Sequence, residues 1–206
     1  MKALRLFVVR HGETAWTREH RYTGGTDVPL SERGQAQAEA VGRALAGEPI
    51  VAVYSSPLER ARTSAEIIAK AFCLDVRIEP AFREMAFGAW EGLTRDEVVA
   101  RFPEAYAAWR NAPHTFRGRD GEDLVAVDER VRAALDGIRR AHAGEVVVLV
   151  THAVVIRLIV LQALGLGPAR LWSVDASPAG LTELELSPEW VTLHRMNTLA
   201  HLEDLA

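Results

Sequence analysis

The residues with the clearest capacity for chemistry stand where an apolar segment ends. The segment LRLFVV, residues 4–9, runs directly into Arg10 and His11. Arginine and histidine side chains need hydrogen-bond partners or a counter-ion when they are buried. Their place directly after an apolar segment therefore predicts that an anion is bound where this segment ends.

Two further apolar segments deliver the same residue types. The run IVAVYSS, residues 50–56, is followed by Pro57 and a helical pattern with Arg60 in its first turn. The run EVVVLVT, residues 145–151, is followed directly by His152. Ligands of parallel sheets gather beyond the carboxyl ends of the strands. If these runs are such strands, two arginines and two histidines converge from three separate places in the chain.

Phosphoryl transfer through a histidine requires this combination of side chains. A neutral imidazole nitrogen can attack phosphorus and carry the phosphoryl group as an intermediate. Charge spreads over three oxygens in the transition state, and guanidinium groups bind such oxygens in bidentate fashion. Arg10 and Arg60 are therefore the expected phosphate ligands, His11 the expected nucleophile, and a protonated His152 would add a third cationic donor.

Local features support an anion at the same place. N–H groups at the start of the helix from Ala153 add a dipole that points at the anion, and Gly12 lets the backbone turn away close to the phosphate without a Cβ. Glu84, in FREMAFGAWEG, is the best candidate to protonate the leaving oxygen, since the like charge of a bound phosphate raises the pKa of a nearby carboxyl. Glu13 and Glu91 are the alternatives for this role.

Each candidate also has a purely structural interpretation. A buried histidine can donate to a backbone carbonyl, and a charged residue near a helix start or in a loop is usually solvated. Packing or an ion pair is favoured for Arg157, and a solvated loop for Arg117 and Arg119. A substrate-facing wall and core packing explain equally well the aromatic residues Phe87, Trp90, Trp109 and Phe116. Solvated positions are predicted for the histidines His20, His114, His142, His194 and His201.

The overall composition indicates that any anion-binding site is a local cluster of basic residues and not a broad basic surface. The chain has 206 residues, 49% of them hydrophobic, and a net charge of -4. This size allows a substantial core, and this charge gives no reason to expect nucleic acid or an acidic membrane as a partner. No apolar window is long enough for a membrane span, and no signal peptide is apparent, so a cytoplasmic location is expected. The single Cys73 excludes an intrachain disulfide and a thiolate metal cluster, and it is expected to be buried at a helix end.

The alternation of strand and helix patterns predicts the fold that holds these groups. The three apolar runs have the Val-rich pattern of strands covered on both faces. Helical patterns are predicted at 31–47, with Ser31 as N-cap, and at 57–72, 123–142 and 153–167, and a final antiparallel pair at 180–186 and 190–196. We therefore expect one α/β domain over residues 1–206, with a mostly parallel central sheet between helices on both faces, a three-layer sandwich. The irregular stretch at about 81–122 reads as a cap-like insertion of short helices and loops over one edge of the sheet.

Several segments together resemble a known family. VVRHGETAW, DVPLSERGQAQA, SSPLERARTSA, FGAWEG and VTHAVVIR follow one another in the order found in the phosphoglycerate-mutase-like branch of the histidine phosphatase superfamily, and the match covers nearly the whole chain. The resemblance implies the phosphoglycerate-mutase-like α/β sandwich, a phosphohistidine at His11, a phosphate pocket of Arg10, Arg60 and His152, Glu84 as proton donor, and no metal or other cofactor.

The chain departs from the family pattern at two positions near the implied pocket. Thr17 stands where many members have an asparagine that contacts phosphate, and its hydroxyl can still donate. Ala153 stands where many members have a glycine after the second histidine, and one methyl group should be tolerated. The turn at Gly24 and Gly25 is expected to border the pocket, so Thr17, Gly24 and Ala153 join the expected substrate-binding residues.

Hydrolysis of small phosphorylated metabolites is the favoured activity. The cofactor-dependent mutases of the family are longer, with an extra segment after the acid loop and a C-terminal tail, whereas here the loop FGAWEG resembles that of broad and alpha-ribazole phosphatases. A cofactor-dependent phosphoglycerate mutase is the alternative, and a non-catalytic phosphate-binding module is the alternative of another class. Metal-dependent hydrolysis is disfavoured, because an arginine beside each candidate ligand would repel the cation. The sequence does not name the substrate, and a homodimer through a sheet edge is compatible with this kind of fold.

Overall fold

The computed structural model describes residues 2–205 and is built around one six-stranded sheet. The strands lie in the order β3-β2-β4-β1-β5-β6, in which the first four pair in parallel and β5 pairs antiparallel with both β1 and β6. Their bounds are β1 Leu4–Arg10, β2 Ile50–Ser55, β3 Val76–Ile78, β4 Val146–Thr151, β5 Leu181–Leu186 and β6 Val191–Thr198. The expected mostly parallel sheet with a final antiparallel pair is confirmed.

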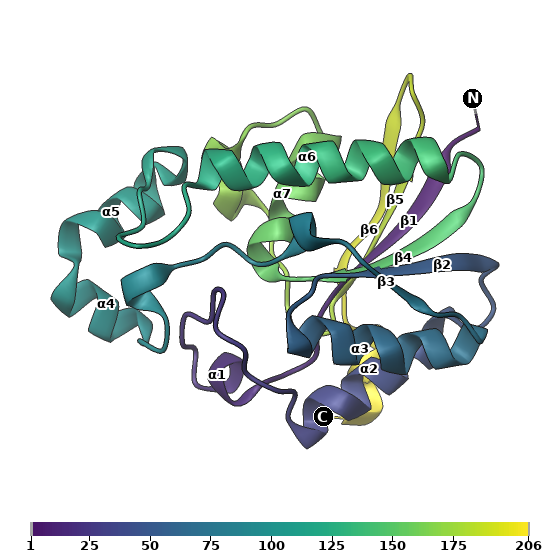
Figure 1. Cartoon of the computed structure of the whole chain (residues 1–206), viewed down its shortest axis with the longest axis horizontal. Coiled ribbons are helices and arrows are strands. Elements are labelled where there is room, and N and C mark those ends of the chain that lie inside the picture. The colour runs from purple at the N-terminus through teal and green to yellow at the C-terminus, as the bar shows by residue number, and fades with distance from the viewer. Residues whose placement is uncertain (1, 206) are drawn as a thin grey trace.

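Helices cover both faces of the sheet, as Figure 1 shows, with α6 and α7 on one side and α2 and α3 on the other. The α-helices are α1 Ala15–Arg18, α2 Glu32–Leu45, α3 Glu59–Ala69, α4 Arg95–Arg101, α5 Pro103–Asn111, α6 Leu124–Ala141 and α7 Ala153–Ala163. Short 3-10 helices are η1 Lys70–Phe72, η2 Pro80–Phe82, η3 Gly88–Trp90, η4 Pro113–Thr115, η5 Pro168–Ser173 and η6 Ala200–Leu205. The predicted three-layer α/β sandwich is therefore confirmed.

The two central strands β1 and β4 are buried on both faces, which explains their unbroken apolar sequences. Alternate residues point to opposite faces of a strand. In β1, Leu6 and Val8 pack on the α6 and α7 side, whereas Phe7 and Val9 pack on the α2 and α3 side. The sheet thus separates two apolar cores and fixes the direction in which Arg10 and His11 leave it.

Capping residues set where the helices begin. Ser31 caps α2 as predicted, because its hydroxyl accepts a hydrogen bond from the Gly34 N–H at 3.0 Å. Helix α3 begins later than predicted, at Glu59, with Leu58 at the N-cap and Pro57 outside the helix. Arg60 nevertheless lies in the first turn, with its side chain fully buried.

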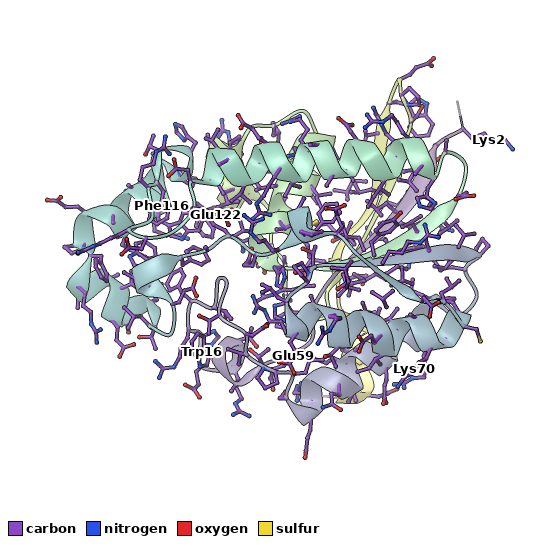
Figure 2. The ribbon with its side chains drawn as sticks, viewed as in Figure 1. Lys2, Trp16, Glu59, Lys70, Phe116 and Glu122 are labelled. Carbon is purple, nitrogen blue, oxygen red and sulfur yellow. The ribbon has the colours of Figure 1, made fainter. Side chains whose placement is uncertain are left out.

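The irregular segment 81–122, called the cap segment below, holds short helices around an aromatic cluster. Trp90 and Phe116 lie 4.8 Å apart between ring centroids, and Trp109 and Phe116 lie 5.0 Å apart. The segment lies beyond the ends of the parallel strands rather than along an edge strand (Figure 1). In Figure 2, Phe116 and Glu122 lie between its helices and the start of α6.

Two polar residues lie in surroundings that the sequence did not indicate. Cys73 is exposed rather than buried, because the chain turns at this residue with a positive φ of 55° after η1. His142 is buried rather than solvated, and its ring nitrogens lie 2.9 Å from the Tyr54 hydroxyl and 2.6 Å from a Glu145 carboxylate oxygen. Between residues 2 and 205, no helix combines the length and the apolar character needed to cross a membrane.

Candidate active site

A cavity of about 530 Å³ opens at the carboxyl ends of β1 and β4, between the sheet and the cap segment. Its wall contains seven of the predicted site residues, namely Arg10, His11, Thr17, Gly24, Arg60, Glu84 and Ala153. His152, the eighth, is completely buried beside it, and its ring centroid lies 5.1 Å from that of His11. Residues from distant parts of the sequence are thus brought to one place.

His11 is held in one tautomer by its own backbone. Its Nδ1 lies 2.8 Å from the Gly12 carbonyl oxygen, which can only accept, so Nδ1 carries the hydrogen and Nε2 keeps its lone pair. Burial, followed by the positive charges of Arg60 and Arg10, lowers the pKa of His11 well below its usual range. The ring is therefore neutral and has the electronic state of a nucleophile.

His152 is also neutral, which corrects the expectation of a protonated side chain. Burial, with the charges of Arg60 and Arg10 adding to it, lowers its pKa well below the usual range. Its Nε2 lies 2.7 Å from the Ser56 hydroxyl, while its Nδ1 is buried without a partner. If the hydroxyl donates to Nε2, the unpartnered Nδ1 carries a hydrogen and can donate to an anion without any net charge.

Arg10 and Arg60 are anchored by backbone carbonyls and still have unused donors. One terminal nitrogen of Arg10 donates to the Ala176 carbonyl at 2.7 Å, and those of Arg60 donate to the Gly24 and Thr26 carbonyls at 2.7 and 2.8 Å. The Nε of each arginine is buried with no hydrogen-bond partner. Burial lowers the pKa of Arg10 to about 10. Buried donors without protein partners favour the binding of an acceptor, and both arginines line the cavity.

Glu84 is the one of the three candidate carboxyls that faces the cavity. Its oxygens accept from the Met85 and Val154 backbone N–H groups at 3.0 and 3.4 Å, and burial raises its pKa. Glu91 is instead bound by the Gly25, Thr26 and Phe87 N–H groups. Glu13 lies 2.9 Å from the Ser31 hydroxyl and is not part of the cavity wall.

The N-terminus of α7, which was predicted to bind an anionic ligand, binds the Glu84 carboxyl with one of its N–H groups. The Val154 N–H, one of the free donors at the helix start, already binds Glu84, so the α7 dipole first acts on a carboxyl and not on a ligand. Thr17 likewise uses its hydroxyl locally, donating to the Thr14 carbonyl at 3.0 Å as part of the α1 cap.

Gly12 is needed for a different reason from the one expected. A Cβ at this position would lie 2.2 Å from the Gly34 carbonyl oxygen in α2. This oxygen belongs to the helix backbone and cannot move aside, so the clash excludes any larger residue. The Gly12 N–H also donates to the Ser64 hydroxyl in α3 at 3.1 Å. The glycine therefore lets the chain that leaves β1 pass close to α2 and α3.

The outer wall of the cavity contains residues that the sequence did not reveal. They come from the loop after α1, from α5 and from the segment 172–178, and include Tyr22, Tyr106, Arg110, Trp172 and Asp175. Arg157 also lines the cavity, and its ion pair with Asp175 at 2.9 Å matches the interpretation given to it. The four cap aromatics are all buried, which matches core packing, and Phe87 and Trp109 also line the cavity, whereas Trp90 and Phe116 do not.

The remaining charged candidates lie outside the cavity wall or in solvent. Arg117 and Arg119 are exposed and pair with neighbouring acidic residues, as expected. His20, His114 and His194 are exposed, although His20 lies at the cavity rim, whereas His201 is half-buried against the Ala179 carbonyl at 3.0 Å. Within residues 2–205, no three His, Cys, Asp or Glu side chains are grouped so that they could hold a metal ion.

Comparison with known proteins identifies related chains across almost the full length. Residues 6–199 match the model of the histidine phosphatase superfamily, branch 1. Phosphoserine phosphatase 1 of Hydrogenobacter thermophilus is 33% identical over 199 residues, which cover 97% of this chain and 94% of that protein. A probable phosphoglycerate mutase, GpmB of Citrobacter koseri, is 34% identical and covers 97% and 95% of the two chains.

The fold has a close counterpart among solved structures. YhfR of Bacillus stearothermophilus superimposes with a TM-score of 0.91 at 31% identity, over 98% of this chain and 100% of that one. The three-layer sandwich thus belongs to an architecture that the two chains share.

Proposed function

Since the chain belongs to the histidine phosphatase superfamily, we propose that it is a metal-independent phosphomonoesterase that acts on small phosphorylated metabolites through a phosphohistidine on His11. Phosphatase activity follows from the family and from the relatives that carry it. The intermediate, the residue roles and the independence of metal are proposed from the site.

One observation carries this proposal, the set of unpartnered donors around a neutral histidine. The Nε atoms of Arg10 and Arg60 and the Nδ1 of His152 are buried without acceptors, beside the free Nε2 of His11. A phosphoryl group in the cavity supplies acceptors for all three donors and a phosphorus atom for the nucleophile. Preorganised donors of this kind stabilise the charge that develops on the transferred group.

The first step forms a bond between His11 Nε2 and phosphorus and breaks the ester bond to the leaving oxygen. Arg10, Arg60 and His152 hold the phosphoryl oxygens, with the Thr17, Gly24 and Ala153 positions as the surrounding wall. Glu84 gives its proton to the leaving oxygen, and its raised pKa keeps a share of the carboxyl protonated for this purpose.

The second step releases the phosphate. The Glu84 carboxylate takes a proton from a water molecule, whose oxygen bonds to phosphorus while the phosphorus–nitrogen bond breaks. The balance is one ester and one water converted to one alcohol and one phosphate, and both His11 and Glu84 return to their starting states. No step needs a metal, because two guanidinium groups occupy the position of a Lewis acid.

The whole chain is proposed to act as a single domain in which the cap segment forms the substrate side of the cavity. Arg95, Tyr106, Trp109 and Arg110 of this segment all line the cavity. A cytoplasmic location and a homodimer stay predictions from the sequence.

A phosphoglycerate mutase is the second candidate, favoured by the similarity to the relative named a probable mutase. A mutase must return the phosphoryl group from histidine before water attacks it, which requires a closed site. The cavity here is bounded on its outer side by exposed residues such as His20 and Asp175. This open rim favours hydrolysis over phosphoryl return. The Glu84 carboxyl argues against a different alternative, because a simple phosphate-binding module has no use for an acid at this place.

Hydrolysis of p-nitrophenyl phosphate in EDTA tests the proposal. Phosphoserine, sugar phosphates and 3-phosphoglycerate with bisphosphoglycerate are run in parallel, and phosphate release and isomerisation are both measured. Release that EDTA leaves unchanged is the expected result. Loss of activity in EDTA contradicts the metal-free mechanism, isomerisation with little release identifies the mutase, and inactivity on every ester supports a binding module.

A further inference from the structure

Glu91, the glutamate of the segment FGAWEG, has no part in the steps proposed above, although several donors bind its carboxylate. Its Oε1 accepts from the Gly25 and Phe87 N–H groups, each at 3.0 Å. Its Oε2 accepts from the Thr26 N–H at 3.0 Å and also from the Thr26 hydroxyl. Charge-assisted hydrogen bonds of this kind are strong and directional, so the carboxylate and the backbone around it hold each other in place.

The backbone of the loop 24–26 lies directly against this carboxylate. Gly24 has a positive φ of 55°, a conformation that favours glycine. A Cβ at this position would lie 2.1 Å from the Glu91 Oε1 and 2.9 Å from the Phe87 nitrogen. Any side chain at position 24 would therefore displace the carboxylate, so the glycine is needed for the contact between the loop and the cap segment.

The same loop holds the guanidinium group of Arg60. The terminal nitrogens of Arg60 donate to the Gly24 and Thr26 carbonyls at 2.7 and 2.8 Å. Two acceptors on one planar guanidinium group fix both its position and its plane. The loop 24–26 is thus bound by Glu91 through its N–H groups and binds Arg60 through its carbonyl oxygens.

The backbone of Glu91 is itself anchored in the cap segment. Glu91 directly follows Trp90, which is buried in the aromatic cluster, and its own N–H donates to the Gly88 carbonyl at 2.9 Å. The hydrogen bond to Gly25 joins residues that are 66 positions apart in the chain. Glu91 therefore connects the cap segment with the loop that holds Arg60.

We propose that Glu91 is a positioning residue for the phosphate site, because it fixes the loop carbonyls that orient the Arg60 guanidinium group. The glutamate of FGAWEG then acts on a phosphate ligand and not as the proton donor. Burial lowers the pKa of Arg60, and the charges of Glu84, Asp27 and Glu91 act in the opposite direction. The inference rests on the proposed phosphatase function, which gives Arg60 its role, and adds to it a residue of the cap segment.

Glu91→Gln tests this inference with a minimal change of shape. The amide nitrogen replaces one carboxylate oxygen and then faces an N–H group from which it cannot accept, so one attachment of the loop is lost. We expect the dissociation constant for inorganic phosphate, measured by calorimetry, to rise about tenfold. The kcat/KM for p-nitrophenyl phosphate should fall by a similar factor, mainly through KM.

A double-mutant cycle separates the positioning of Arg60 from a general loss of structure. In the Arg60→Gln protein, adding Glu91→Gln should change kcat/KM by less than about twofold, because the group that Glu91 orients is gone. In the Glu84→Gln protein, the same addition should still lower kcat/KM by about tenfold. Equal losses in the two backgrounds would overturn the inference, since Glu91 would then act on the cavity without acting through Arg60.

Glu97→Gln is the matched control. This carboxylate belongs to the same cap segment and accepts from the Thr94 N–H at 2.8 Å, but it lies outside the cavity wall. Phosphate affinity and activity should be unchanged. A fall as large as that in Glu91→Gln would overturn the inference, because loosening any part of the cap segment would then weaken the site.

Thr26→Val is a milder variant if Glu91→Gln does not fold. It removes only the hydroxyl donor to Glu91 and should weaken phosphate binding by about threefold, as expected for one hydrogen bond. Unchanged affinity in this variant would overturn the inference.

Binding of inorganic phosphate separates this inference from the proposed function, since it needs no turnover. An active phosphatase whose phosphate affinity is the same in Glu91→Gln overturns the inference and leaves the function intact. Phosphate affinity that depends on Glu91 supports the inference even if no ester is hydrolysed. Urea unfolding tests the link without any ligand: the midpoint shifts of Glu91→Gln and Arg60→Gln should combine to less than their sum, and additive shifts would overturn the inference.

Discussion

The phosphate end and the cap side of the cavity are built in different ways. His11 and His152 directly follow central strands and are buried, with ring and guanidinium positions fixed by the sheet, by α3 and by backbone carbonyls. On the cap side, Arg110 is exposed, and its guanidinium group stacks on the Trp172 ring. Under the proposed function, the groups that act on the phosphoryl oxygens lie on the sheet scaffold, whereas the groups that would meet the leaving alcohol lie on short helices and loops. Substitutions should accordingly damage chemistry at one end and selectivity at the other.

The largest effect is expected at the nucleophile. His11→Ala should lower kcat for p-nitrophenyl phosphate by at least about 10⁴-fold, because no other group can carry the phosphoryl intermediate. Protein denatured at alkaline pH after brief incubation with a labelled phosphomonoester should carry label in the unaltered chain and none in this variant, because a phosphorus–nitrogen bond survives alkali but not acid. Retention of most of the activity would show that the scaffold end does not supply the nucleophile.

Arg60→Gln should affect both activity and folding. The side chain lines the cavity and donates to the Gly24 and Thr26 carbonyls, so loss of the proposed phosphate contact should lower kcat/KM by about 10² to 10³-fold. Buried carbonyls that lose a charged donor should also lower the free energy of unfolding by about 2 kcal/mol. Urea titration and steady-state kinetics measure the two effects. An unchanged midpoint would mean that the loop at Gly24 does not depend on Arg60.

Glu84→Gln should distinguish substrates by their leaving group. An alkyl phosphate needs its leaving oxygen protonated and should react about a hundredfold more slowly, whereas p-nitrophenyl phosphate, which has a good leaving group, should lose less. Equal losses on the two esters would exclude Glu84 as the acid.

The pH profile follows from the same residues. Burial raises the pKa of Glu84, and the first step needs its protonated form, so kcat/KM for alkyl esters should fall as pH rises through that raised pKa. Glu84→Gln should remove this dependence. The lowered pKa of His11 keeps the nucleophile free down to unusually low pH, so activity should be lost on the acid side only below the ordinary histidine range. Loss of activity on the acid side with an apparent pKa in the ordinary histidine range would contradict this.

The smallest catalytic effect is expected in the cap core. Phe116→Leu leaves a small void among Trp90 and Trp109 and should lower the free energy of unfolding by about 1 kcal/mol. The rate on p-nitrophenyl phosphate should change by less than about twofold, because none of the phosphate donors touches this ring. A large loss of kcat would show that the cap core positions the chemistry as well as the alcohol.

The sequence predicted the scaffold end well because its signals are local. Val-rich runs indicate strands that are buried on both faces. These runs are followed by Arg10 and His11, by Arg60 and by His152, which the structure brings together. Strand β3 gave no such signal, since it is three residues long and contains Arg77. Pro57 was predicted inside the helix but lies before its N-cap. His142 was predicted in solvent but is buried with two hydrogen-bond partners. Both features depend on tertiary contacts, which residue spacing does not reveal.

The cap side was much less predictable. Trp172 and Asp175 lie in a segment without helical or strand periodicity, so nothing in their spacing marks them as cavity residues. Arg157 was correctly assigned an ion pair, but the stacking of Arg110 on Trp172 joins residues 62 positions apart, which is visible only once the chain is folded. Specificity was therefore the part of the function that the sequence left open.

The placement of β1 also has a consequence during synthesis on the ribosome. This strand is made before its two neighbours, β4 and β5, and the Ala176 carbonyl that anchors Arg10 follows it by 166 residues. A nascent chain therefore exposes an apolar strand without its pairing partners until most of the domain has emerged, a state in which aggregation competes with folding. His11, the proposed nucleophile, is translated long before Ala176 and the other residues that complete its surroundings, so a partly translated chain has no complete phosphate site.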